Sequence, residues 1–327
     1  MGERIIKVST SFPNWPLIRQ TPKGEGVWGN CKFIINKPIQ ECDYWVVYED
    51  LLRTEEVVCP IKNTLLITGE PPSIKKYGKD FLNQFSNIIT CQKDIKHKGV
   101  TYVQQALPWH VGRSLEETRP DSMNKCYDEL KKTERFNKTK LMSVVVSGKR
   151  STKGHRARLT FVEHLKRRFG DRLDVFGQGG RPIDDKWDAI ADYKYHIVIE
   201  NSSCEDYWTE KLADAFLGGA YPFYFGCKNI HKYFSSKALT AIDISKVEDS
   251  IKLIEREILD LRYEGSVKNI DLARNLILDK YNVFPVIHSA ITPSIYNEDK
   301  SKIKIVEQSK FNTKKSFFRK YFARMAR

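Results

Sequence analysis

Long apolar runs are missing from this 327-residue sequence. No stretch approaches the ~18 consecutive apolar residues that a membrane-spanning helix needs, which excludes an integral helical membrane protein. The opening residues, MGERIIKV, lack the apolar core of a signal peptide, and Ile6 stands where an N-myristoylation signal requires serine or threonine. We therefore expect a cytoplasmic protein without a membrane-spanning anchor.

Cysteine pairs at metal-binding or redox spacing are also missing. The seven cysteines are an odd number, and none of them belongs to a Cys-x-x-Cys motif. This argues against a disulfide framework or a zinc site and favours a reducing compartment. We expect the cysteines to be small residues of the core.

Negative charge is scarce, because 41 acidic residues face 55 Lys and Arg and leave a net charge of +14. Residues 299–327 carry +8 of this excess and the rest of the chain only +6. Nucleic-acid binding would explain a basic chain, but no zinc-finger, RNA-binding-sheet or helix-turn-helix signature accompanies the charge. We therefore expect no nucleic-acid partner; a strongly salt-dependent affinity for single or double strands would be the sign of one.

The length predicts two domains, since 327 residues exceed one ordinary core and suit two domains of about 130 to 150 residues. We place an N-terminal domain at 1–127 and a C-terminal domain at 141–298. The segment 128–140 is charged and poor in apolar residues, which predicts a linker or interdomain helix. A basic tail follows at 299–327.

Short apolar runs without polar alternation predict buried strands of parallel sheets, and intervening helical patterns make both domains α/β. The strands predicted in the first domain are 4–8, 43–48, 64–68, 87–90 and 100–104. Those predicted in the second domain are 141–147, 172–176, 195–199, 221–225 and 239–242, with later helices at 247–261 and 267–281.

The C-terminal domain is centred on residues 193–226, YKYHIVIENSSCEDYWTEKLADAFLGGAYPFYFG. A strand at 195–199 leads through a polar loop into a helix, and two glycines stop the helix before a strand at 221–225, which completes a βαβ unit. Lys211 lies in the first turn of the helix, where the helix dipole disfavours a cation unless a bound anion supplies negative charge. This position therefore predicts a phosphate site.

A second cationic segment follows the predicted strand 141–147. Residues 148–158 form a basic loop with two glycines at the start of an amphipathic helix. Backbone N–H groups, the helix dipole and arginine side chains all favour phosphate at such a place. The loop is not a Walker A motif, because the Gly-x-x-x-x-Gly-Lys-Ser order is missing. Arg158 is the candidate phosphate ligand, and Arg156 is the alternative.

The signature of a known family runs through the central unit. Residues 193–202 read Tyr-x-Tyr-x-x-x-x-Glu-Asn-Ser, residues 207–211 read Tyr-x-Thr-Glu-Lys, and Pro222 and Gly226 close the second strand. This pattern resembles the signature of the α-1,3-fucosyltransferases, glycosyltransferase family 10, of the bacterial type without a transmembrane anchor.

Two positions depart from the commonest form of that signature. Ile199 replaces an aromatic residue and Trp208 replaces a small β-branched residue, and both changes keep a buried character. The resemblance implies the GT-B fold, in which two Rossmann-like domains face each other across a cleft. It also implies inverting transfer of fucose from GDP-fucose to a hydroxyl of a GlcNAc- or glucose-containing glycan or glycolipid, in α-1,3 linkage, as in lipopolysaccharide biosynthesis.

The resemblance assigns a donor site as well. Arg158 is followed by an aromatic residue at +3 and by leucine at +7, as in the family, and would hold the pyrophosphate together with Lys211. Asn201 and Tyr207 would orient the donor by hydrogen bonds, and Glu210 would accept from its ribose or sugar hydroxyls. Because two cations would replace a metal and no convincing Asp-x-Asp pair is present, we expect no essential divalent metal and no cofactor besides the donor.

A catalytic base is predicted where the strand 64–68 ends in Gly-Glu-Pro-Pro. Ligands of open α/β sheets bind beyond the carboxyl ends of the strands, and the proline after Glu70 keeps this glutamate extended. In the family, a glutamate in a similar setting is the proposed catalytic base, and Glu70 matches it in position and context. Glu49 and Asp50, at the end of the preceding strand, are the competing candidates.

Four further side chains have supporting roles in this interpretation. Glu200 is expected to brace the donor loop. His110 stands beside a tryptophan, which is more typical of a packing residue than of a catalytic one. Trp15 and Trp28 lie in a long loop at 9–30; their flat faces suit the apolar side of a pyranose, and anchoring of the loop is the alternative.

The end of the tail predicts a membrane contact. Residues 314–327, KKSFFRKYFARMAR, place five apolar side chains at helical spacings and six cations largely on the other side. This is the profile of an interfacial helix on an anionic membrane, here the inner face of the cytoplasmic membrane, with a packed helix or a solvated tail as the alternative. Because 297–304 resembles a linker, we expect the tail to move independently of the rest.

Two other functions stay open at this point. The same fold can use another nucleotide-sugar, which turnover of GDP-mannose or UDP-sugars would reveal. A non-catalytic carbohydrate- or nucleotide-binding protein would bind its ligand without transfer.

Overall fold

The computed structural model describes residues 2–13, 15–113, 125–134, 136–147, 153–177, 180–292 and 299–311, the side chains of Lys153 and His155 excepted. Predictions on other residues, among them most of the basic loop and the amphipathic end of the tail, lie outside these ranges. The chain divides into two compact units, one made of 1–106 and 284–327 and the other of 107–283.

These units differ from the boundaries expected from the sequence. The chain enters the second unit after Ala106, and its C-terminal part returns to the first unit. The charged segment expected as a linker contains α2 (Tyr127–Lys132). Within the second unit, the buried Arg274 donates to the carbonyl of Leu130 at 3.2 Å. Polar contacts hold much of this segment, among them those of Lys131 with Asp279 and of Lys138 with the carbonyl of Gly218, so hydrophobic periodicity does not reveal them.

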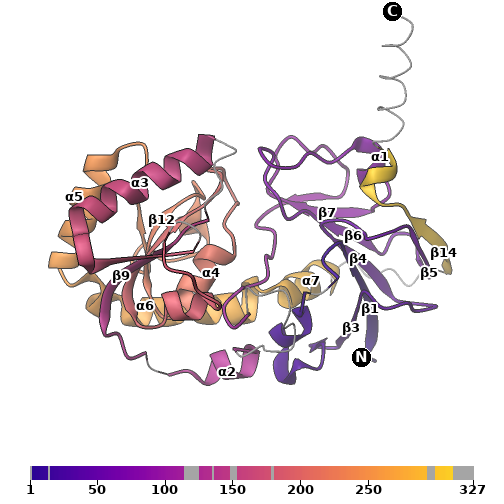
Figure 1. Cartoon of the computed structure of the whole chain (residues 1–327). Coiled ribbons are helices and arrows are strands. Elements are labelled where there is room, and N and C mark those ends of the chain that lie inside the picture. Colours follow the sequence, from indigo (N-terminus) through magenta and orange to yellow (C-terminus); the bar gives the residue numbers. More distant parts are fainter. Residues whose placement is uncertain are drawn as a thin grey trace, which may run out of the picture. The chain divides into compact units, whose positions relative to one another are not determined.

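The first unit is built on a seven-stranded sheet of order β2-β3-β1-β4-β6-β7-β8 (Figure 1). Its strands are β1 (Arg4–Thr10), β2 (Val27–Trp28), β3 (Cys31–Ile35), β4 (Tyr44–Tyr48), β6 (Thr64–Ile67), β7 (Asn87–Thr90) and β8 (Val100–Tyr102). Only β2 and β3 pair antiparallel; the other neighbours are parallel. The five strands predicted here are confirmed, and the structure adds β2 and β3.

The central position of β4 explains its sequence, YWVVY, in which every residue is buried. A parallel strand covered on both faces needs apolar side chains on both sides. Trp45 and Val47 pack in one cluster with Leu66 of β6 and Phe81 of the short helix α1 (Lys79–Leu82). This packing holds the carboxyl ends of β4 and β6 in place.

The C-terminal part of the chain pairs with the first unit. β14 (Lys300–Ile305) forms an antiparallel two-stranded sheet with β5 (Glu55–Pro60). Lys300 pairs with Glu41 and Asp43, each at 2.7 Å, and Ile305 is buried. The expectation of an independent linker at 297–304 is therefore wrong for the residues described there. Its alternating lysines are the outward positions of a strand, not a solvated spacer.

The second unit has a five-stranded parallel sheet of order β10-β9-β11-β12-β13. Its strands are β9 (Lys140–Val145), β10 (Leu173–Phe176), β11 (Tyr193–Ile199), β12 (Tyr221–Phe225) and β13 (Thr240–Ala241). All five correspond to predicted strands. An α/β chain with a parallel sheet in each unit, the composition of the GT-B fold class, is therefore confirmed.

Helices cover both faces of the second sheet (Figure 1). The helices of this unit are α3 (Lys153–Phe169), α4 (Glu210–Leu217), α5 (Val247–Leu259) and α6 (Arg262–Leu276), then a π-helix, η6 (Ile277–Tyr281). The next helix, α7 (Val283–Ile291), belongs from Phe284 onward to the first unit. The 3-10 helices are η1 (Leu17–Gln20), η2 (Pro22–Gly24), η3 (Gly170–Arg172), η4 (Lys186–Ala189) and η5 (Ile230–Lys232). α3 packs against α5, and α4 packs against α6. None of the described helices combines the length and apolar character of a membrane span.

Candidate functional site

The strand order of the second sheet reverses at β9. The chain runs from β9 outward to β10 and then returns to the other side of β9 as β11. The connections after β9 and β11 therefore leave on opposite faces of the sheet. In open α/β sheets, ligands bind at the carboxyl ends of the strands at such a switch point. Ser147 follows β9 and Asn201 follows β11, so both residues lie at this edge.

Arg158 joins these two connections. It extends from α3 and is only 5% exposed. Its guanidinium donates to Asn201 Oδ1 and to Ser147 Oγ, both at 3.0 Å, while its Nε has no hydrogen-bond partner among the described atoms. Arg156 is exposed. Of the two candidate arginines, the structure therefore places Arg158 at the switch point and against Asn201.

Glu200 is buried behind the loop that leads from β11 into α4. Its carboxylate accepts from the backbone N–H of Thr209 at 2.8 Å and from the Thr209 hydroxyl at 2.7 Å. Thr209 is the N-cap residue of α4, and its hydroxyl accepts from the N–H of Lys211. Burial raises the pKa of Glu200, and Lys211 opposes this effect. The expected bracing role of Glu200 agrees with these contacts.

Lys211 lies between two carboxylates of its own chain. Its Nζ is 3.3 Å from Glu200 Oε2 and 3.2 Å from Glu210 Oε1. Burial alone would lower the pKa of Lys211, but the two glutamates outweigh burial and raise it. Negative charge at the N-terminal end of α4 thus comes from the protein itself. The helix-dipole argument alone does not require a bound anion here.

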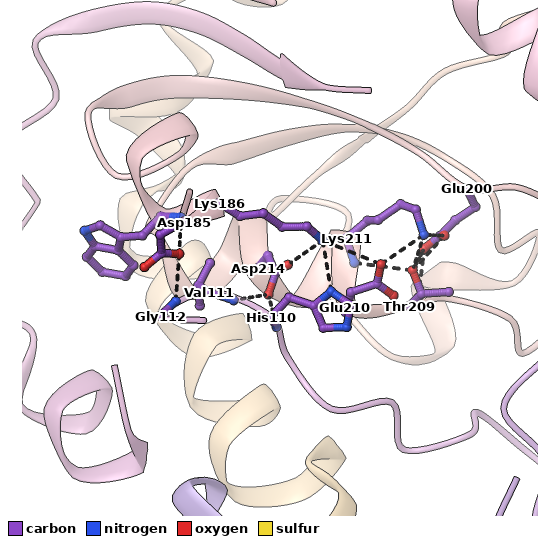
Figure 2. A network of polar contacts seen from close by, with 11 residues as sticks. His110, Val111, Gly112, Asp185, Lys186, Glu200, Thr209, Glu210, Lys211 and Asp214 are labelled. Atoms are coloured by element: carbon purple, nitrogen blue, oxygen red, sulfur yellow. Dashed lines mark hydrogen bonds and ion pairs between the residues drawn. The ribbon is translucent and has the colours of Figure 1, made fainter. Parts of the chain in front are cut away.

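A second cation, Lys186 of η4, extends the row of charges (Figure 2). Its Nζ is 3.6 Å from Glu210 Oε1, 3.2 Å from Asp214 Oδ2 and 3.3 Å from His110 Nδ1. Positive and negative groups therefore alternate from Glu200 through Lys211, Glu210 and Lys186 to Asp214. Burial would raise the pKa of Glu210, but Lys211 and Lys186 hold it well below its usual range. Glu210 is consequently an ionised acceptor.

The backbone N–H groups of residues 110–112 are hydrogen-bonded to Asp214 and Asp185. Asp214 Oδ1 accepts from the N–H groups of His110 at 2.8 Å and Val111 at 3.1 Å, and Asp185 accepts from the N–H of Gly112 at 2.8 Å (Figure 2). Burial and the charge of Lys186 lower the pKa of His110 well below its usual value. Since an ammonium only donates, Nδ1 of a neutral His110 accepts from Lys186, and the ring proton is on Nε2.

Tyr207 is only 2% exposed. The preceding residue, Asp206, is in the left-handed region at φ 59° and anchors the loop. Its carboxylate accepts from Asn229 at 3.0 Å, Lys232 at 3.0 Å and Tyr233 at 2.6 Å. The structure therefore gives Tyr207 the burial of a packing residue, and a hydrogen bond from Tyr207 to a ligand stays a prediction.

The candidate base and its two competitors lie at the carboxyl ends of β4 and β6 in the first unit. Glu49 is 5% exposed and pairs with Lys75 at 2.8 Å. Asp50 accepts from the backbone of Leu51 at 2.8 Å and of Gln308 at 3.1 Å. Glu70 is more exposed than Glu49. The carboxylate of Glu49 is thus bound within the protein, and the assignment of Glu70 as the base stays a prediction.

Sequence reasoning missed Lys186, Asp185 and Asp214 and gave His110 no part in the site. Asp214 carried a usable signal, because a carboxylate among the buried apolar residues of α4, one helical turn after Glu210, requires a partner. Lys186 carried none, since only tertiary folding brings η4 to α4.

The part of the chain that the structure describes contains no group of three or more His, Cys, Asp and Glu side chains placed to hold a metal ion. Among the cysteines, Cys31, Cys42, Cys59, Cys91 and Cys227 are buried. The prediction of core residues is confirmed for these five and is wrong for Cys126 and Cys204, which are only half-buried.

Residues 135–259 match a family model described as glycosyltransferase family 10 (fucosyltransferase), C-terminal. A GDP-fucose protein O-fucosyltransferase 3 from Xenopus tropicalis is 30% identical over 106 residues, which are 29% of this chain and 22% of that protein. The α-(1,3)-fucosyltransferase FucT of Helicobacter pylori is 26% identical over 99 residues, 28% of this chain and 21% of that one. An α-(1,3)-fucosyltransferase 4 from Bos taurus is 40% identical over 78 residues, 22% and 20% of the two chains.

These alignments span about a fifth of the length of the curated relatives. A crystal structure of an α1,3-fucosyltransferase aligns over 86% of this chain and 92% of that one, with 16% identity and a TM-score of 0.44. The family model covers Arg158, Asn201 and the row of charges from Lys186 to Asp214. Residues 135–259 of this chain are therefore similar to the C-terminal domain of glycosyltransferase family 10, the fucosyltransferase family.

Proposed function

We propose that this protein is an inverting fucosyltransferase. It would transfer fucose from GDP-fucose to a hydroxyl group of a GlcNAc- or glucose-containing glycan, in α-1,3 linkage. The observation that carries the proposal is the pairing of Arg158 with Asn201 at the switch point of the domain that matches family 10. The names of the similar proteins support the donor and the linkage.

Arg158 and Lys211 are the proposed pyrophosphate ligands. Both interact electrostatically with Glu200, so this carboxylate links the two cations. Arg158 would exchange its hydrogen bond to Ser147 for a phosphate oxygen, and its Nε is available as a further donor. The side chain of Lys211 is 25% exposed. Its ammonium also donates to Thr209 Oγ1 at 3.1 Å, so a phosphate oxygen would replace one of its three acceptors.

Glu210 and Asn201 would bind hydroxyl and carbonyl groups of the donor. Glu210 is held ionised between Lys211 and Lys186, so it accepts hydrogen bonds and donates none. A carboxylate of this kind selects a ligand that presents hydroxyl groups, such as ribose or fucose. Tyr207 would contribute a hydrogen bond only after a rearrangement that exposes it.

Glu70 is the proposed general base. The acceptor oxygen would attack the anomeric carbon of fucose from the side opposite GDP and pass its proton to Glu70. The bond from that carbon to the β-phosphate oxygen breaks, and its electron pair remains on GDP. Arg158 and Lys211 would offset the charge that develops on the leaving group, so we propose that no divalent metal is essential.

Incubation with GDP-fucose and a panel of lactose and N-acetyllactosamine acceptors, followed by linkage analysis of the product, tests the proposal. We expect α-1,3-fucosylated product, retained activity in EDTA, and much lower turnover of GDP-mannose and UDP-sugars. Binding of GDP-fucose without transfer to any acceptor would instead indicate a non-catalytic binding protein. Faster turnover of another nucleotide-sugar would overturn the assignment of the donor.

A further inference from the structure

Glu49 holds the turn that carries Glu70 through hydrogen bonds to three residues of the turn. Glu49 directly follows β4 and is 5% exposed, and its backbone N–H donates to the carbonyl of Ile67 at 2.8 Å. One oxygen of its carboxylate accepts from the backbone N–H of Gly69 and from the hydroxyl of Tyr77. The other accepts from Lys75 at 2.8 Å. A single carboxylate therefore joins both ends of the segment from Gly69 to Tyr77.

Gln92 holds the same segment through its backbone carbonyls. Its side-chain amide donates to the carbonyl of Glu70 at 2.7 Å and to that of Lys75 at 3.0 Å. Gln92 is 1% exposed, so these hydrogen bonds are shielded from water. Two hydrogen bonds thus fix the backbone around Glu70. Glu49 accepts from the N–H of the preceding residue, Gly69, and Gln92 donates to the carbonyl of Glu70 itself.

The conformation of Glu49 indicates that these contacts are strong. Its φ of 71° lies in the left-handed region, which is unfavourable for a residue with a β-carbon. Strained backbone of this kind persists where the surrounding contacts determine it, and it concentrates at functional sites. Burial and the charge of Glu49 raise the pKa of Tyr77, so Tyr77 remains a hydrogen-bond donor.

We propose that Glu49 is a positioning residue for Glu70 and that it is not itself the base. The carboxylate of Glu49 fixes the start of the turn through Gly69 and its end through Lys75 and Tyr77, and so sets the direction of the Glu70 side chain. This inference rests on the proposed function of Glu70. A base displaced by about 1 Å loses on the order of 10²-fold in rate, so loosening the turn reduces kcat without removing the base.

The test compares Glu49→Gln with Glu56→Gln in the full-length protein. Glu49→Gln keeps an acceptor oxygen for Gly69 but removes the charge that holds Lys75. Glu56 pairs with Lys302 at 2.7 Å on the exposed face of β5 and is the matched control. In Glu49→Gln we expect kcat to fall about 10- to 100-fold with little change in KM for GDP-fucose. We also expect faster hydrogen exchange in a peptide covering residues 69–77, and wild-type behaviour in Glu56→Gln.

The pH profile separates positioning from base catalysis. The acidic limb of kcat/KM should persist in Glu49→Gln, because Glu70 still titrates, and disappear in Glu70→Gln. Disappearance of the limb in Glu49→Gln would identify Glu49 as the base and overturn the inference. Unchanged kcat and unchanged exchange at 69–77 would also overturn it.

Two further measurements keep the inference testable by itself. If Glu49→Gln does not fold, Tyr77→Phe removes one donor of the same carboxylate and should give a smaller fall in kcat and faster exchange at 69–77. If Glu70→Gln retains turnover, the proposed base is wrong. Faster exchange at 69–77 in Glu49→Gln would then still show that Glu49 holds the turn.

Discussion

Lys211 shows how neighbouring residues decide what a single charge does. It stands at the N-terminal end of α4, where the helix dipole disfavours a cation. Glu200 and Glu210 lie 3.3 and 3.2 Å from its ammonium, so the three groups together carry a net charge of −1. A pyrophosphate approaching this end of α4 therefore needs a further cation. Arg158, the other proposed ligand, supplies it.

Replacing either cation should weaken nucleotide binding. We expect Arg158→Ala and Lys211→Ala each to reduce affinity for GDP about 10- to 100-fold, because a hydrogen bond to a charged group contributes about 1.5–3 kcal/mol. Calorimetric titration with GDP measures this, with Arg156→Ala as the control because Arg156 is exposed. Unchanged affinity in both variants would falsify the assignment of the phosphate site.

Glu70 is the residue on which the proposed chemistry depends. Glu70→Gln preserves the shape of the side chain and removes the base, so we expect nearly unchanged affinity for GDP-fucose and a loss of about 10² to 10⁴ in kcat. Steady-state kinetics and calorimetry on the same preparation measure both quantities. Near wild-type turnover would transfer the role of base to another carboxylate, with Asp50 as the next candidate.

At the scale of elements, η4 and α4 are joined by Lys186. This side chain is 15% exposed and lies between Glu210 and Asp214, so it separates two carboxylates that would otherwise face each other. Asp214 in turn accepts from the backbone of His110 and Val111. One lysine thereby holds α4, η4 and the segment 110–112 together.

Lys186→Met should loosen this junction. We expect the second unit to lose about 1–3 kcal/mol of stability, because two buried acceptors lose a charged donor. The pKa of Glu210 should rise, which weakens donor binding towards acidic pH. Urea denaturation measures the stability, and GDP-fucose affinity between pH 5 and 8 measures the second effect. If Lys186→Met has the stability of the wild type and the same pH dependence of GDP-fucose affinity, Lys186 contributes neither to stability nor to donor binding.

β11 contains a buried histidine, His196, that should make the stability of the protein depend on pH. His196 is 4% exposed, and its Nδ1 is 2.8 Å from Ser143 Oγ of β9. Burial, together with Lys186 and Lys138, lowers the pKa of His196 to about 3. Because the folded state binds this proton less readily than the unfolded chain, His196 costs stability as the pH falls below the unfolded pKa of about 6.5.

This cost predicts that the free energy of unfolding falls by about 1.4 kcal/mol for each pH unit below 6.5, through His196 alone. We expect the stability difference between wild type and His196→Asn to shift in favour of the variant as the pH is lowered from 7 to 4. Urea denaturation of both proteins at matched pH values tests this. A pH-independent difference would mean that folding does not change the pKa of His196.

At the scale of the whole molecule, residues 300–311 return to the unit that contains the N-terminal strand β1. β14 pairs with β5, and Gln84 donates to the carbonyl of Val306 at 2.9 Å. Gln308 donates to the carbonyl of Lys76 at 2.9 Å, within the segment from Gly69 to Tyr77 that carries Glu70. Residues 300–311 are therefore part of the first unit, and a truncation within them removes structure together with the tail.

Two truncations separate the tail from the fold. A chain ending at Phe311 should keep transfer to a soluble acceptor but lose binding to vesicles rich in anionic lipid, because it lacks the predicted amphipathic helix. A chain ending at Ile303 should also be less stable, since it loses part of β14 and Gln308. Equal vesicle binding by the full-length protein and the chain ending at Phe311 at low salt would refute the membrane role.

The sequence by itself determined most of the parallel strands and the similarity of the second unit to glycosyltransferase family 10. Buried parallel strands are apolar on both faces, so their runs stand out without any tertiary information. The motif from Tyr193 to Gly226 indicated the resemblance to family 10, because its residues are close in sequence and its spacing follows a strand, a loop and a helix. The resemblance also selected Arg158 and Asn201, which the structure brings to 3.0 Å from each other.

Only the tertiary structure decided which charged side chains contact each other and that residues 300–305 form a strand of the first unit. Lys186 and Asp214 are far apart in sequence from His110, and no periodicity connects them. The lysines of β14 looked like a linker, because a half-exposed strand and a solvated spacer share the same polar composition. Hydrophobic patterns report burial within one element, whereas contacts between polar groups depend on which elements the fold places side by side.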